Sequence, residues 1–360
     1  MRRLVTCSDG TWKSSESETR TNVYYVSRAI LPRAPDGVEQ LVLYDAGVGA
    51  EGSFVDRISG GAFGKGLDDN ILDAYRFFVD NYEEGDRLYL FGFSRGAYTA
   101  RSAVGLIRKC GILRREHADR IEEAYELYRR RDDHVDGPAA RAFRERYSRP
   151  TPKIAFLGVW DTVGALGIPL LGLRWLTRRK YQFHDTELSG IVEKAFHAVS
   201  IDERRGPFRP TLWSETPKPD QIVEQTWFPG VHSDIGGGYE ERGLADVTFA
   251  WMVTRAELYG GLAFDHEYIR RELNITLPHT IDLDNARYDA ELHDSLTGVY
   301  RLLHRHDRTI QPDAPTQAVW QTAEQRYKDS TLGYRPKPLV EYFAAPNHRV
   351  ARHGVFDVNV

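Results

Sequence analysis

The stretch FGFSRGAYTAR, residues 91–101, sets Gly92, Ser94 and Gly96 in a glycine–X–serine–X–glycine pattern. The apolar run RLYLFGF (87–93) is typical of a buried strand, and the segment AYTARSAVGLIRKCG (97–111) has one apolar helical face. A serine at such a junction stands on a sharp turn from strand to helix, with its hydroxyl raised above the sheet. The alternative interpretation is that Ser94 is an ordinary N-cap of the following helix.

Five more apolar runs predict strands, and they are RLVTC (3–7), QLVLYDAG (40–47), KIAFLGVWD (153–161), KAFHAVSID (194–202) and EQTWFPGVH (224–232). Their apolar residues are continuous rather than alternating, which indicates strands covered on both faces. Helical patterns such as LDDNILDAYRFFVDNY (67–82) lie between them. The sequence therefore predicts an α/β fold, α/β-hydrolase-like, with a largely parallel central sheet flanked by helices.

We expect one domain, 1–360, because no internal repeat or low-complexity linker divides the chain. Two segments break the alternation and are predicted to be cap insertions, about 114–150 and 165–190. The first is dense in charge and is expected to lie outside the core, because its apolar stripe is narrow and consists of Ile121, Ala124, Tyr125 and Leu127.

The second insertion begins with ALGIPLLGLRWLTRRK (165–180), in which apolar residues are followed by basic ones. One interpretation is a lipid-facing entrance to a site, with peripheral membrane contact. The other is that the leucines belong to the core and the basic residues form a solvated helix end. Both stay open at this point.

Composition excludes several classes of protein. The net charge of −4 and the pI of about 6.3 give no basic excess for nucleic acid. No apolar run approaches the roughly 18 residues of a transmembrane helix, and the apolar start is too short for a signal peptide. We therefore expect synthesis in the cytoplasm, with Cys7 and Cys110 reduced and buried; neither lies in a CxxC pair that would indicate a metal site.

A nucleophilic serine requires a base and an acid. His232 directly follows an apolar strand in PGVHSDIGGGY (229–239), at the strand end where α/β sheets build their sites. His197 lies inside a strand and is expected to be a core residue. Asp161 and Asp202 both follow strands between the serine and the histidine; we favour Asp161, because Asp202 belongs to the charged string DERR (202–205), which is consistent with an internal salt-bridge cluster.

Backbone N–H groups would complete the site as an oxyanion hole. The N–H of Arg95 follows the serine, and that of Gly10 or Thr11 lies in the loop after the first strand. Asp9 either caps its own turn, or contacts substrate or fixes the loop. No cofactor and no metal are expected for this chemistry.

The motifs SDGTW (8–12), TNV (21–23), GFSRGAYTAR (92–101), VWDTVGA (159–165), SIDERRGPF (200–208) and WFPGVHSDIGGGY (227–239) occur in this order. With them the sequence resembles the α/β-hydrolase family that includes the catalytic domain of type VI secretion phospholipase effectors. The resemblance implies a serine esterase or phospholipase with Ser94 as nucleophile, His232 and an aspartate completing a triad, and a phospholipid or other ester as substrate. It also implies delivery to another compartment by a secretion system as an alternative to a cytoplasmic role.

Two rival functions remain. A metal-dependent phosphohydrolase would use Asp9 after the first strand, with Asp161 and Asp234 joining it on a divalent cation. A non-catalytic interaction module would keep the fold without chemistry. The phosphohydrolase would leave the glycine–X–serine–X–glycine turn without a purpose, and the intact set of serine, histidine and aspartate argues against the interaction module, so we favour the serine hydrolase.

Overall fold

The computed structural model describes residues 1–10, 19–47, 62–130, 132–163, 187–213, 216–297, 300–301 and 305–353. Its strands are β1 (Arg3–Ser8), β2 (Gln40–Asp45), β3 (Arg87–Phe93), β4 (Ile154–Trp160), β5 (Lys194–Ser200), β6 (Ile222–Phe228), β7 (Gln317–Trp320) and β8 (Val350–Ala351). Its α-helices are α1 (Asn22–Ala29), α3 (Ala62–Asn81), α4 (Arg95–Cys110), α5 (Ile121–Arg129), α6 (Pro138–Tyr147), α8 (His232–Gly236), α9 (Gly243–Arg255), α10 (His266–Leu273), α11 (Ile281–Arg287), α12 (Gln321–Lys328) and α13 (Lys337–Ala344). Short 3₁₀ or π turns are η1 (Arg115–Arg120), η2 (Gly206–Phe208) and η3 (Ala256–Gly260).

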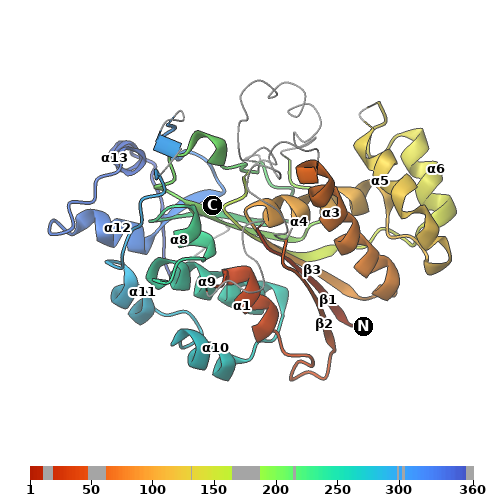
Figure 1. Ribbon diagram of the computed structural model, residues 1–360, viewed down its shortest axis with the longest axis horizontal. Coiled ribbons are helices and arrows are strands. Elements are labelled where there is room, and N and C mark those ends of the chain that lie inside the picture. The colour runs from red at the N-terminus through yellow and green to blue at the C-terminus, as the bar shows by residue number, and fades with distance from the viewer. Residues whose placement is uncertain are drawn as a thin grey trace.

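All of these strands form one sheet in the order β2-β1-β3-β4-β5-β6-β7-β8 (Figure 1). Each pair of neighbours is parallel, which confirms the largely parallel sheet that the sequence predicts. The chain leaves β1 toward β2 on one side and then returns past it to β3 on the other. The strand order therefore reverses between β1 and β3. In parallel α/β sheets this reversal opens a crevice at the carboxyl ends of the strands, where ligands bind.

Both faces of the sheet are buried, which explains the continuous apolar runs. Along β3, Leu88 and Leu90 pack into the core formed with α3 and α4. Tyr89, Phe91 and Phe93 point to the opposite face and join the core formed with α1 and α9. Figure 1 shows these helix pairs on opposite sides of the sheet. The fold is α/β-hydrolase-like.

The segment 114–150 forms η1, α5 and α6 beside α3 and α4 (Figure 1). Its apolar stripe is buried in the same core cluster as α4, so the expectation that this segment lies outside the core is wrong. Four apolar side chains at helical spacing suffice to seat a helix of nine residues on a neighbouring layer. Most of the second predicted insertion, 165–186, lies outside the described residues, and so does the segment on which the lipid-entrance hypothesis rests.

The sheet has more strands than the sequence predicts, because β7 and β8 show no recognisable strand pattern. The predicted strand 224–232 also ends early, at Phe228, because Pro229 has no N–H for the ladder and α8 begins at His232. Cys7 and Cys110 are buried free thiols, as expected. In the described part of the chain, no helix has the length and apolar character needed to span a bilayer.

Candidate active site

Ser94 stands on a strained turn between β3 and α4. Its φ of 59° and ψ of −118° lie in a region that side chains other than glycine rarely adopt, and such strain gathers at functional sites. The glycines on either side are required by contact. A Cβ on Gly96 would overlap the Ser8 carbonyl, and one on Gly92 would overlap the backbone of Gly96. The serine is nevertheless nearly buried, with 7% of its surface exposed.

Strand register brings the second candidate residue beside this turn. Phe93 pairs with Trp160, and the Ser94 N–H donates to the Trp160 carbonyl at 3.1 Å. Asp161 follows Trp160 at once and has a φ of 38°, a second left-handed backbone at a strand end. The carboxyl ends of β3 and β4 thus present Ser94 and Asp161 at the same edge of the sheet.

His232, the first residue of α8, joins Asp161 there. Its Nδ1 lies 2.5 Å from Asp161 Oδ2, and its ring packs between Phe93 and Phe208, at 4.6 and 5.0 Å between ring centroids. Burial lowers the pKa of His232, with Asp161 opposing that shift, so the imidazole is neutral near pH 7. Among the described residues, no hydrogen bond joins Ser94 to His232; catalytic hydrogen bonds are often long in the absence of substrate.

Arg308 is a member of the site that sequence reasoning missed. Its guanidinium binds Asp161 in a bidentate pair, with Nη1 at 2.5 Å from Oδ1 and Nη2 at 2.9 Å from Oδ2. Nη1 also donates to the Ser200 carbonyl at 2.8 Å and Nη2 to the Phe208 carbonyl at 2.7 Å. Burial alone would raise the pKa of Asp161, but the charge of Arg308 and the hydrogen bond from His232 hold it far below its usual range.

The Asp161 carboxylate is consequently saturated. Oδ1 accepts hydrogen bonds from Arg308 and from the Ser200 N–H at 3.0 Å, while Oδ2 accepts from Arg308 and His232. Both Asp161 and Arg308 are almost wholly buried. The carboxylate therefore stays ionised, and its position is set from four directions.

The other candidate acid, Asp202, has different partners. It accepts the Gly230 N–H at 2.7 Å and the Tyr334 hydroxyl at 2.7 Å, and burial raises its pKa to about 6. The salt-bridge cluster expected in DERR is formed by its neighbours, since Arg205 pairs with Glu203 at 2.8 Å. Of the two aspartates, the structure brings only Asp161 to His232.

The predicted oxyanion donors lie around the serine in part. A Cβ on Gly10 would be 3.4 Å from the Ser94 Cβ, so this loop does approach the turn. The Gly10 N–H, however, donates to Asp9 Oδ1 at 2.7 Å. Arg95 supplies the first helical N–H of α4, and Thr11 lies outside the described residues.

Asp9 caps its own turn and also fixes the loop to neighbouring segments of the chain. Besides Gly10, its carboxylate accepts the hydroxyls of Thr21 and Tyr44, at 2.5 and 2.9 Å. Burial raises its pKa to about 6. His197 is also structural in its contacts: it is fully buried inside β5, and its Nε2 accepts the Thr162 N–H at 3.0 Å.

These contacts do not support the hypothesis of a metal-dependent phosphohydrolase. Asp161 is held by Arg308, and Asp9 by hydroxyl and amide donors. Asp234 accepts the Val231 N–H at 2.9 Å and lies 2.6 Å from His293 Nδ1. The three carboxylates thus turn to separate partners rather than toward a common cation.

Comparison with known proteins gives a consistent picture. The family described as "T6SS, Phospholipase effector Tle1-like, catalytic domain" matches residues 2–255. An uncharacterized protein of Saccharomyces cerevisiae is 29% identical over 247 residues, which are 63% of this chain and 35% of that protein.

Two solved structures are also similar. One is the Tle1 effector bound to the VgrG spike of the type 6 secretion system, at 20% identity and a TM-score of 0.37, covering 66% of this chain and 51% of that one. The other is an uncharacterized protein from Pseudomonas aeruginosa, at 18% identity and a TM-score of 0.39, covering 74% and 47%. The chain spans only about a third to a half of the length of these proteins.

Proposed function

Because the chain belongs to the family of type VI secretion phospholipase effector Tle1-like catalytic domains, we propose that it is a serine hydrolase that cleaves the carboxylic esters of phospholipids. The observation that carries the proposal is the meeting of a strained serine turn and a buried histidine–aspartate pair at one edge of the sheet. That combination is what acyl transfer through a serine requires, and no binding module needs it.

In the proposed mechanism, Ser94 Oγ attacks the ester carbonyl and His232 Nε2 accepts its proton. Nδ1–H stays hydrogen bonded to Asp161, which fixes the tautomer and stabilises the imidazolium as it forms. His232 then returns the proton to the leaving alcohol. The neutral ring favoured by burial is the form that can act as this base.

The oxyanion would be bound by the N–H of Arg95, supported by the N-terminus of α4. A second donor would come from the loop after β1. The N–H of Gly10 can serve only after it leaves Asp9, and that of Thr11 is the other candidate in our proposal.

Arg308 is proposed as a positioning residue. It contacts Asp161 and two backbone carbonyls, so it acts on the reaction through the acid and touches no reacting atom. Its positive charge also lowers the pKa of Asp161, together with His232, and so favours the ionised carboxylate that holds the proton on His232 Nδ1.

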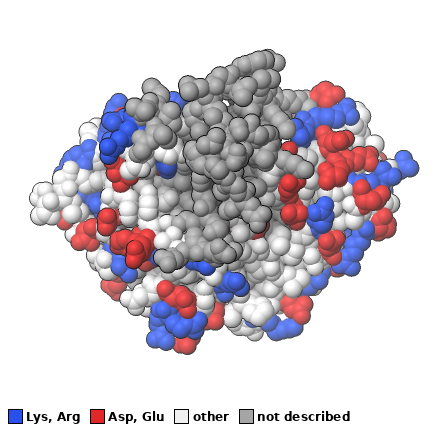
Figure 2. Space-filling view, viewed as in Figure 1, with Lys and Arg blue, Asp and Glu red and all other residues white. Residues whose placement is uncertain are grey.

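The described part of the face seen in Figure 2 does not have the charge pattern of a surface that binds a polyanion. In Figure 2, acidic and basic side chains are interspersed over the coloured part of the face in view, without the basic stripe that is typical of nucleic-acid binding. The family description includes a secretion system, and the Tle1 effector of the solved structure is bound to VgrG. We therefore propose membrane phospholipid, met after delivery, as the substrate class.

The deciding experiment compares wild type with Ser94→Ala and with Ser27→Ala as a matched control. Ser27 lies on α1, and its hydroxyl binds the Tyr24 carbonyl away from the site. Each protein is assayed on defined phospholipids and p-nitrophenyl esters, and is labelled with a fluorophosphonate probe. Loss of a nucleophile costs at least about a thousandfold in turnover, so we expect Ser94→Ala to be unlabelled and inactive and Ser27→Ala to match wild type.

Two outcomes contradict the proposal in different ways. Retention of more than about a tenth of the wild-type rate by Ser94→Ala would exclude Ser94 as the nucleophile. Labelling of Ser94 together with activity on soluble esters and none on phospholipids would keep the mechanism and overturn the substrate class.

A further inference from the structure

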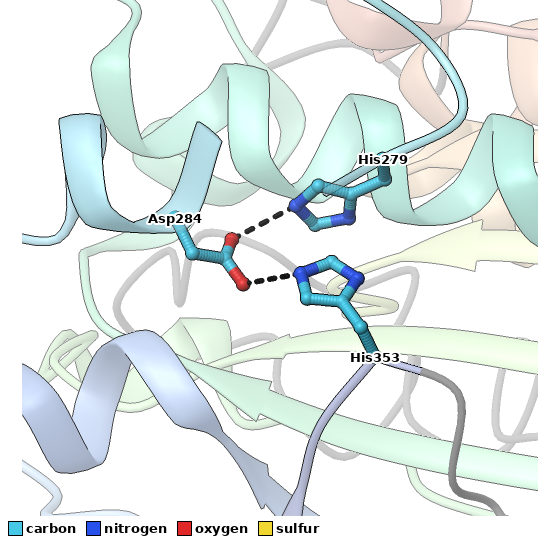
Figure 3. Close-up of side chains that lie close together, drawn as sticks. All are labelled: His279, Asp284 and His353. Atoms are coloured by element: carbon cyan, nitrogen blue, oxygen red, sulfur yellow. Dashed lines mark hydrogen bonds and ion pairs between the residues drawn. The ribbon is translucent and has the colours of Figure 1, made fainter. Parts of the chain in front are cut away.

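A second cluster of ionisable side chains lies outside the candidate active site. Figure 3 shows His279, Asp284 of α11, and His353 just after β8, with both imidazoles directed at the carboxylate. His279 Nε2 is 2.8 Å from Asp284 Oδ1, and His353 Nε2 is 2.8 Å from Oδ2. One donor atom from each residue lies within 4.8 Å of the others. We propose that these three residues bind a zinc-type divalent metal ion.

The charge of Asp284 points to a cation. The side chain is fully buried, and its carboxylate also accepts hydrogen bonds from Trp320 Nε1 at 3.0 Å and Gln321 Nε2 at 2.5 Å. These are neutral donors, and in the described part of the chain no lysine or arginine pairs with Asp284. A buried anion needs a positive partner, and a divalent ion between the two imidazoles supplies it.

The donor chemistry fits a borderline metal. Zinc binds imidazole nitrogens and carboxylate oxygens at about 2.0–2.2 Å. Two histidines and one aspartate would leave the fourth position of the ion for a water molecule. Hard ions such as Mg²⁺ and Ca²⁺ prefer all-oxygen sites. The hydrogen bonds from Trp320 and Gln321 would orient the carboxylate from outside the metal shell.

Binding of the ion requires a change in the ring protons of the two histidines and a route by which the ion can enter. Coordination requires Nε2 of each histidine to be free of its proton. The metal would replace the contact between His279 Nε2 and Asp284 Oδ1, and the ring proton would then be carried by Nδ1, which has no hydrogen-bond partner among the described residues. His353 is about one-fifth exposed, which leaves an entry for the ion.

The metal would act on the fold rather than on the ester. His353 comes from the end of the chain that forms the edge strand β8, while the other two ligands flank the start of α11. The site adjoins β7, four strands from β3, or about 19 Å at ordinary strand spacing. The ion would therefore fasten the last strand to the helical layer, and this proposal does not depend on the proposed function.

The test uses the full chain, stripped with a chelator and titrated with ZnCl₂ by calorimetry, and with Co²⁺ followed by its visible absorption. Wild type should bind one equivalent through this cluster, show the intense d–d bands of low-coordinate Co²⁺, and gain melting temperature when loaded. His353→Ala should bind at least about tenfold more weakly and lose both the bands and the temperature gain. His348→Ala, which removes an exposed histidine of the same region, should match wild type.

Asp284→Asn provides a second variant that keeps the side-chain volume. If it does not fold, His353→Ala still decides, because His353 is partly exposed. Equal binding by wild type and His353→Ala, or no binding by wild type at micromolar Zn²⁺, would overturn the proposal. Ester hydrolysis by loaded and stripped protein should be equal at 25 °C; a requirement for the metal in turnover would overturn the structural role.

Discussion

The substitution Arg308→Met tests whether the buried ion pair organises the site. Methionine keeps much of the side-chain length but removes four hydrogen bonds and the charge. Asp161 would then be a buried carboxylate with only His232 and the Ser200 N–H as partners. Removing one member of a buried pair costs about 3–5 kcal/mol, because the other charge is left without compensation.

Urea denaturation measures this loss as a change in midpoint at constant slope. The control is Arg270→Met, which breaks an exposed pair with Glu267 and should change stability by about 0.5 kcal/mol or less. A double variant sharpens the test. Arg308→Met combined with Asp161→Asn removes both charges of this pair, so it should recover part of the loss that the single variant suffers.

The pH profile of ester hydrolysis provides an independent readout. Without the arginine, the uncompensated negative charge of Asp161 favours the imidazolium form of His232 and so raises the pKa of that histidine. Because the reaction needs the neutral ring, the acid limb of kcat/KM should move to higher pH in Arg308→Met. A stability loss below about 1 kcal/mol, together with an unmoved acid limb, would refute the role assigned to Arg308.

Two more predictions concern packing and protonation. In Gly96→Ala the new Cβ meets the Ser8 carbonyl, a backbone atom that cannot turn aside, so we expect a loss of about 3 kcal/mol or more in urea denaturation; an unchanged midpoint would contradict this close approach. His197 is buried with a pKa lowered to about 3, chiefly by burial, so between pH 6.5 and 3 the unfolded chain binds a proton that the folded chain does not, and stability falls as the pH falls. Between pH 7.5 and 5 wild type should lose about 2 kcal/mol more than His197→Gln, which cannot titrate, and parallel stability curves for the two proteins would contradict it.

The sequence predicts those parts of the fold whose signal is local. The six long strands are recognisable because each is a continuous apolar run, and β3 is found at its observed bounds, Arg87–Phe93. β7 has four residues and β8 has two, which is too short for a periodic pattern to emerge from polar surroundings. β7 is placed in the sheet by pairing with β6, and β8 by pairing with β7, and no local signal reveals either pairing.

The candidate site divides in the same way. Ser94, Asp161 and His232 each follow an apolar strand, so their shared edge could be inferred from the order of strands alone. Arg308 follows no strand and sits in a polar stretch, where an arginine is ordinarily solvated. Its partner Asp161 lies 147 residues earlier, and only the folded chain brings the two together.

The sheet has a kinetic consequence. All of its described strand pairs are parallel, so no two neighbouring strands are joined by a tight hairpin. One edge of β1 (3–8) therefore stays unpaired until β3 (87–93) is available to pair with it. Pairing over such separations is slow, because chain entropy is lost before contacts form. The residues of the candidate site belong to successive parts of this assembly, in the order Ser94, Asp161, His232 and Arg308, and Arg308 lies shortly before β7 in the sequence. A nascent or partly folded chain therefore contains Ser94 long before it contains the residues that we propose activate it.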